Sequence, residues 1–176
     1  DLPYKSFMDF LERVNLSAIN KRALEVLIKT GCFDTLGERR SKLLLNLEQA
    51  VDYVSKKKEA TEFGQVSLFE DSGEKEFLDF TYEETEDWPE LEKLRLEKEL
   101  IGFYISGHPL EMHKKIIDSL VSLRTNAIEH LSKERNYAIL ALVKEVRPIL
   151  TKKQQWMGLG QLEDLHGTIK FTAFPK

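Results

Sequence analysis

The sequence predicts an α+β protein, with an all-helical N-terminal module followed by a meander of three strands. Three observations predict this class. Apolar residues recur at helical spacing up to about residue 120, the pattern changes to strand-like alternation from about residue 137, and turn residues separate the alternating runs. Hydrophobic residues make up 41% of the 176 positions, which suffices for a packed core. No run approaches the roughly 18 apolar residues of a spanning helix, so no membrane partner is expected.

Two short helices joined by a turn are predicted at the N-terminus. Ser6 can cap a helix over residues 6–14, in which apolar residues recur at i, i+3, i+4 and i+7. Asn20 can cap a second helix from Lys21 to about residue 30, and Gly31 is placed to end it in the left-handed conformation. The outline is that of a helix–hairpin–helix pair.

In a helix–hairpin–helix motif, backbone N–H groups at the start of the second helix face a phosphate. Lys21 and Arg22 lie at that start and are candidates for binding double-stranded DNA. A plain antiparallel helix pair with a solvated basic surface is an equal alternative, because the hairpin lacks the usual central glycine.

A third helix is predicted from Glu38 to about Thr61. Cationic residues gather at its start, and two of them, Arg39 and Arg40, are further candidates for phosphate binding. The only cysteine, Cys32, excludes a disulfide within the chain and a cysteine-based zinc site. It is expected to be a small buried residue.

An acidic segment follows the third helix. Residues 70–90 carry ten carboxylates and one lysine, a net charge of −9, so the net −4 of the chain leaves +5 for the remainder. The body should therefore attract phosphate while this segment is repelled by it. The aromatic residues scattered through the segment are expected to pin it to the body; they are Phe77, Phe80, Tyr82 and Trp88.

An adjacent apolar pair, Leu68 and Phe69, precedes the acidic segment. Neighbouring residues point in different directions in a helix or a strand, so the pair cannot enter one core together. Such a pair on a polar segment is typical of a peptide that anchors in a partner's pocket, with Gln65 as a hydrogen-bonding address. The residues alone favour equally the alternative that the pair folds back onto the neighbouring helix.

The next helix is predicted from Glu90 to about Ser106, with Glu97 among the charged residues on its solvent face. Gly107-His108-Pro109 is expected to end it. A short helix over about residues 110–120 and a connector to residue 131 come next. The remaining predicted elements are strands over residues 137–150, 157–162 and 168–174, with a turn over residues 164–167.

Five short sequence motifs, in a fixed order along the chain, resemble motifs of one protein family. They lie at residues 20–34, 65–69, 97–110, 146–153 and 162–167. With them, nearly the whole chain resembles the C-terminal third of the alpha subunit of bacterial DNA polymerase III, a C-family replicative polymerase.

The resemblance implies a role for each part of the chain. The N-terminal helices would belong to a tandem helix–hairpin–helix unit that grips double-stranded DNA. Residues 65–69 would form the internal motif for the β sliding clamp, with contacts from Gln65, Ser67, Leu68 and Phe69. The strands would begin an OB-fold. The implied divisions are 1–61 (DNA- and clamp-binding helices), 62–89 (clamp peptide and acidic linker), 90–130 (helical connector) and 131–176 (partial, truncated OB-fold).

The OB-fold implied by the resemblance suggests contact with single-stranded DNA. Trp156, in a loop-like stretch, is the candidate for stacking on bases, and Arg147, Lys152 and Lys153 are candidates for phosphates. Phe171 shares a strand face with other apolar residues and is expected in the core.

We expect a non-catalytic fragment of a longer, bacterial cytoplasmic protein of the nucleoid-associated replisome. It would tether the polymerase to the clamp, contact DNA and meet other replicase subunits. No catalytic residue, metal ligand or cofactor is expected in this fragment, whereas the parent polymerase would use Mg²⁺ held by upstream carboxylates. One alternative is a helical scaffold with a single-stranded-DNA-binding OB module that does not bind the clamp, and another is a purely structural spacer.

A metal-dependent enzyme is a further alternative, suggested by His108, Glu111 and His113. It is disfavoured because histidines five residues apart do not share one helical face, and Pro109 interrupts the backbone between them.

Overall fold

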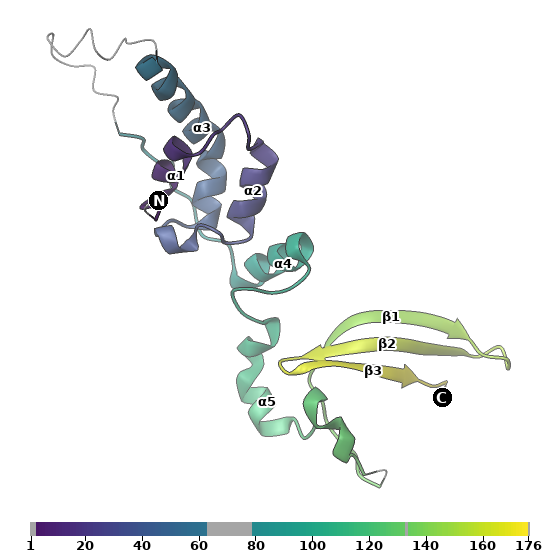
Figure 1. The fold of residues 1–176 in the computed structure, drawn as a ribbon. Helices are drawn as coiled ribbons and strands as arrows, with labels where there is room; N and C mark the ends of the chain where they lie inside the picture. The colour runs from purple at the N-terminus through teal and green to yellow at the C-terminus, as the bar shows by residue number, and fades with distance from the viewer. Residues whose placement is uncertain (1–2, 63–78, 133, 176) are drawn as a thin grey trace, which may run out of the picture. The chain divides into compact units, whose positions relative to one another are not determined.

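The computed structural model describes residues 3–62, 79–132 and 134–175. The predicted clamp-binding residues Gln65, Ser67, Leu68 and Phe69, and also Phe77, lie outside the described residues. The chain forms two compact units, Asp1–Ser106 and Gly107–Lys176. Within the described residues, the helical elements and the three strands of Figure 1 confirm the predicted α+β class, a helical module followed by a partial OB-like sheet.

The first unit begins with two capped helices. The Ser6 hydroxyl accepts a hydrogen bond from the backbone N–H of Asp9 (3.0 Å) and starts α1 (Phe7–Arg13). The Asn20 side chain accepts one from the N–H of Ala23 (2.8 Å) and starts α2 (Lys21–Lys29). Gly31 follows α2 at φ 82°, as predicted.

The long helix α3 (Arg40–Glu62) is the support on which α1 and α2 pack (Figure 1). A short 3-10 helix, η1 (Asp34–Leu36), connects α2 to it. The ring of Phe33 lies 5.0 Å from that of Phe7 and 4.9 Å from that of Phe10. The buried core comprises Phe7, Phe10, Leu11, Leu24, Ile28, Phe33, Leu43, Leu47, Ala50 and Val54. Cys32 is exposed, so its predicted burial was wrong: the turn after α2 directs Phe33 into the core in its place.

Residues 79–88, here called the strap, form no helix or strand and contact α3 and the residue before it through Phe80, Glu83 and Thr85. The buried side chain of Asn46 donates to the carbonyl of Glu83 (2.9 Å) and accepts from its N–H (2.7 Å). The Phe80 ring lies 5.6 Å from that of Tyr53 and packs against the core. The expected pinning by aromatic residues is confirmed for Phe80 and Tyr82.

Helix α4 (Glu90–Ile101) is shorter than predicted. Gly102 adopts the left-handed conformation at φ 95° and donates to the carbonyl of Lys98 (3.0 Å), which ends the helix five residues before Ser106. Glu97 was also misplaced by the prediction, because its side chain is fully buried rather than on the solvent face.

The second unit starts with short helical turns and ends in a sheet. Residues 110–120 divide into a 3-10 helix, η2 (Pro109–His113), and α5 (Lys114–Leu120), and a further 3-10 helix, η3 (Thr125–His130), follows. The strands are β1 (Leu142–Leu150), β2 (Trp156–Asp164) and β3 (Gly167–Ala173), antiparallel in the order β1-β2-β3 (Figure 1). Strand β1 begins five residues later than predicted, and Trp156 starts β2 rather than lying in a loop.

Candidate nucleic-acid interface

The turn between α1 and α2 brings two predicted phosphate-binding residues to the surface. The Asn15 side chain accepts a hydrogen bond from the N–H of Ser17 (3.0 Å), which shapes the turn. Lys21 and Arg22 then occupy the exposed first turn of α2. The Lys21 ammonium lies 3.2 Å from Glu48 of α3, and both side chains are largely exposed, so the ion pair is weak.

The cations at the start of α3 have different environments. Arg39 is exposed and donates from Nη1 to the strap carbonyl of Thr85 (3.2 Å). The Lys42 ammonium lies 2.8 Å from Glu84 of the strap and 2.9 Å from Glu38, and the hydrogen bonds that it donates to these two carboxylates raise the pKa of Lys42.

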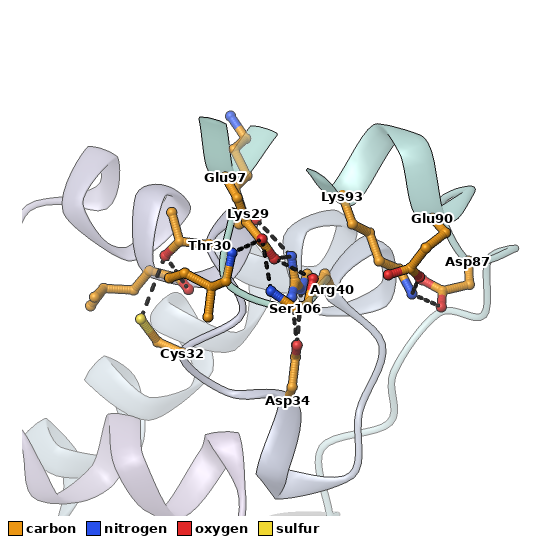
Figure 2. A network of polar contacts seen from close by, with 12 residues as sticks. Lys29, Thr30, Cys32, Asp34, Arg40, Asp87, Glu90, Lys93, Glu97 and Ser106 are labelled. Atoms are coloured by element: carbon orange, nitrogen blue, oxygen red, sulfur yellow. Dashed lines mark hydrogen bonds and ion pairs between the residues drawn. The ribbon is translucent and has the colours of Figure 1, made fainter. Parts of the chain in front are cut away.

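Arg40 is buried, with 4% of its side chain exposed (Figure 2). Its Nη2 contacts the Asp34 carboxylate at 2.6 Å, and its Nη1 donates to Glu97 at 2.9 Å and to the Lys29 carbonyl at 3.2 Å. A guanidinium engaged in this way joins the end of α2, η1 and α4. The predicted phosphate contact from Arg40 does not fit this environment, because reaching a phosphate would break two ion pairs.

Glu97 completes this network from the other side. Its carboxylate accepts hydrogen bonds from the N–H groups of Ile105 (2.7 Å) and Ser106 (3.0 Å) and from the Ser106 hydroxyl (2.6 Å). Burial alone would raise the pKa of Glu97, but the hydrogen bonds from Ser106, Ile105 and Arg40 outweigh it and lower the pKa to about 2. The network of Figure 2 therefore fixes the chain that leaves α4.

The β1–β2 connection places three of the predicted single-strand contacts together. The five-residue turn over 151–155 is closed by a hydrogen bond from the Thr151 N–H to the Gln155 carbonyl (2.9 Å). Lys152 and Lys153 lie in this turn and are exposed, and Trp156 follows it with 66% of its surface exposed.

Arg147 lies on the opposite face of the sheet from Trp156. Trp156 pairs with Leu150, whereas Arg147 pairs with Leu159, and side chains alternate between faces along a strand. Arg147 is 77% exposed and ion-paired with Glu145. The structure therefore brings Lys152, Lys153 and Trp156 together and separates Arg147 from them.

Two buried carboxylates with structural roles were not recognised in the sequence. Asp164 accepts hydrogen bonds from the N–H (2.8 Å) and hydroxyl (2.5 Å) of Thr125, and from the N–H groups of His166 (2.7 Å) and Gly167 (3.1 Å). Burial opposes ionisation, but these hydrogen bonds lower the pKa of Asp164. The burial of Glu97 had a signal in the sequence. Glu97 comes three residues after the buried Leu94, and residues three apart lie on the same face of a helix.

No metal cluster is found among the described residues, where no group of three or more His, Cys, Asp or Glu side chains is placed to hold an ion. His108 instead caps η2, with its Nδ1 accepting a hydrogen bond from the N–H of Leu110 (3.2 Å). Within the same described part of the chain, no helix has the length and apolar character needed to cross a membrane.

Comparison with protein-family models first defines the class of the N-terminal helices. Residues 1–43, which contain α1, α2 and the start of α3, match the family model described as a helix-hairpin-helix motif. This match favours the helix–hairpin–helix interpretation over the plain helix pair.

The relatives then identify the family. The chain is 39% identical to DNA polymerase III subunit alpha of Treponema pallidum over 98% of its length. It is 38% identical to that of Borreliella burgdorferi and 31% identical to that of Vibrio cholerae, each over 97% of its length. The chain therefore belongs to the family of bacterial DNA polymerase III alpha subunits. It spans about 15% of the length of these relatives.

Proposed function

We propose that this chain is a non-catalytic part of a replicative DNA polymerase that tethers the polymerase to the sliding clamp and contacts DNA. The observation that carries the proposal is the match to the alpha subunits over 97–98% of the chain, together with the helix–hairpin–helix match at its start. The parent protein would be a DNA-directed DNA polymerase that uses Mg²⁺ at carboxylates outside this chain, in the bacterial cytoplasm, in contact with other replicase subunits.

The tether would be the segment containing Gln65, Ser67, Leu68 and Phe69. Gln65 would bind a polar socket of the β sliding clamp, and Leu68 and Phe69 would fill an adjoining apolar groove. Burying each apolar side chain contributes about 1.5–3 kcal/mol before ordering costs, so the segment alone should bind with a Kd on the order of micromolar. Simultaneous binding of the polymerase to DNA would raise the overall affinity through effective concentration.

The DNA contacts would be divided between the two units. Lys21, Arg22 and Arg39 are exposed cations of the first unit and would bind duplex phosphates. In the second unit, Lys152, Lys153 and Trp156 would bind single strands by phosphate contact and base stacking. Arg147 would act separately, from the other face of the sheet.

Titration against the purified clamp tests the tether. The chain and a Gln65→Ala, Leu68→Ala, Phe69→Ala variant are each titrated into the β sliding clamp of the same bacterium and followed by calorimetry. We expect the variant to lose about tenfold or more in affinity, since the apolar anchors supply most of the binding energy. A Val66→Ala variant is the matched control and should bind like the unmodified chain.

Equal affinities of the chain and the triple variant would contradict clamp tethering. If single-stranded DNA binding through Trp156 persisted in that case, the helical scaffold with a single-strand-binding module would be the better description. The exposure of Trp156 beside Lys152 and Lys153 is the observation that favours this second candidate.

A further inference from the structure

We propose that residues 84–87 of the strap compete with DNA phosphate for the cations at the start of α3 and so restrain duplex binding. This inference rests on the DNA contact proposed above and concerns its regulation. It follows from the contacts of the strap, which place an acidic stretch on a candidate phosphate-binding surface.

The N-terminal half of the strap is firmly anchored. Asn46, which is 1% exposed, both donates to and accepts from the backbone of Glu83. The Phe80 ring packs between Tyr53 at 5.6 Å and Tyr82 at 5.0 Å. Buried, fully satisfied hydrogen bonds and aromatic packing are costly to break, so this half should stay in place.

The C-terminal half is held by charge at the surface. Glu84 lies 2.8 Å from the Lys42 ammonium, yet its side chain is 71% exposed. The Thr85 carbonyl accepts from Arg39 at 3.2 Å, and the Asp87 carboxylate accepts from the Lys93 ammonium of α4 at 2.7 Å and from the hydroxyl of the buried Ser41 at 3.4 Å. Exposed ion pairs are weak and screened by salt, so this half can leave without unfolding the unit.

The side chains that contact residues 84–87 carry hydrogen-bond donors of the kinds that bind phosphate. Arg39 offers a guanidinium, Ser41 a hydroxyl and Lys42 an ammonium, in neighbouring positions of the chain. In the structure each of them is bound to a strap oxygen. A phosphate oxygen would accept from the same donors, so DNA and residues 84–87 exclude one another. Release of the strap would add Arg39 and Lys42 to the duplex contact made by Lys21 and Arg22.

Matched charge variants of the whole chain provide the test. Glu84→Gln with Asp87→Asn removes the two carboxylates that contact α3. Asp79→Asn with Glu86→Gln removes the same charge from other positions of the strap, for which no ion pair is found among the described residues. Affinity for a short DNA duplex is measured by fluorescence anisotropy. We expect the first variant to bind roughly three- to tenfold more tightly than the second, because only it removes the Glu84 and Asp87 side-chain contacts that hold residues 84–87 over Arg39 and Lys42.

Hydrogen exchange gives a second readout. Added duplex should accelerate exchange over residues 84–88, while the Glu83 amide, which donates to Asn46, stays protected. Equal gains in both charge variants, or increased protection of residues 84–88 on binding, would overturn the inference.

A Lys21→Ala, Arg22→Ala variant separates the two proposals. If it binds duplex as tightly as the unmodified chain, the proposed helix–hairpin–helix contact fails, whatever the strap variants show. If it binds more weakly but the two strap variants are equal, the DNA contact stands and the competition by the strap is overturned. If only the Glu84→Gln, Asp87→Asn variant binds duplex, the strap masks the α3 cations completely, which supports the inference. If none of the proteins binds duplex, both proposals are overturned.

Discussion

Arg40 and Glu97 show how burial converts charged residues into structural ones. A buried ion pair is costly to form, but removing one partner leaves the other charge uncompensated. Arg40 has a second carboxylate partner in Asp34, and Glu97 has three further donors at Ile105 and Ser106. The pair therefore holds α3 and α4 together by hydrogen bonds that water cannot replace.

Replacing Glu97 by Gln should destabilise the first unit by about 3–5 kcal/mol, because the Arg40 guanidinium stays buried with one carboxylate fewer. Urea unfolding followed by helical circular dichroism measures the loss. Glu99→Gln is the control on the same helix, since Glu99 is 60% exposed and should contribute within about 1 kcal/mol. Matching midpoints for the two variants would show that the buried pair adds nothing.

The pKa of Glu97 predicts a pH dependence. Its value of about 2 lies below the ordinary 4.5, so in this range the unfolded chain binds the proton more readily and stability rises with pH. The contribution, about 3 kcal/mol, is complete above about pH 5 and is lost as the pH falls toward 2. Unfolding free energies measured between these limits should depend less steeply on pH in Glu97→Gln than in the unmodified chain, and identical slopes would contradict the assignment.

Among the secondary-structure elements, the packing of the three-stranded sheet depends on the positions of glycine residues in β2. Strand β2 has glycine at 158 and 160, both on the face that carries Trp156 and Phe171. At Gly160 an added Cβ would lie 2.6 Å from the Phe171 ring and would also meet the Glu145 carbonyl. At Gly158 the nearest atom would be 3.6 Å away, an ordinary contact. Phe171 is thus partly covered by packing over Gly160.

Gly160→Ala should therefore destabilise the sheet by about 1–3 kcal/mol through overpacking, whereas Gly158→Ala should be nearly neutral. Hydrogen exchange of the β2 and β3 amides reports on the sheet directly. The comparison holds the residue type, strand and face constant, so a difference isolates the close approach of Phe171 and Glu145. Equal protection in both variants would show that Phe171 moves aside without cost.

For the whole molecule, uneven charge determines how it meets DNA. The net charge of the chain is −4. Residues 70–90 have a net charge of −9, so the remaining residues together have a net charge of +5. Arg40 is buried and does not contribute to the accessible charge. The exposed cations proposed for duplex DNA are in the first unit, and those proposed for single strands lie in the β1–β2 turn of the second.

Duplex binding should weaken with salt with a log–log slope of about −3.6, as expected when DNA displaces residues 84–87 and Lys21, Arg22, Arg39 and Lys42 each neutralise one phosphate. Lys152→Ala with Lys153→Ala should leave this slope unchanged and reduce the slope for single-stranded DNA by about 1.4. Anisotropy titrations between about 50 and 200 mM salt measure both. A flat duplex slope would count against phosphate contacts from the first unit.

Local signals in the sequence determined the starts of α1 and α2, the left-handed Gly31, the hairpin turn at residues 164–167 and the α+β class, because each depends on neighbours within a few residues. They also carried the family resemblance. The tertiary structure decided the rest: Arg40 meets Glu97 across 57 residues, Asn46 meets Glu83 across 37, and Thr125 meets Asp164 across 39. Whether a charged side chain faces DNA or another side chain depends on such distant partners, and no local pattern specifies them.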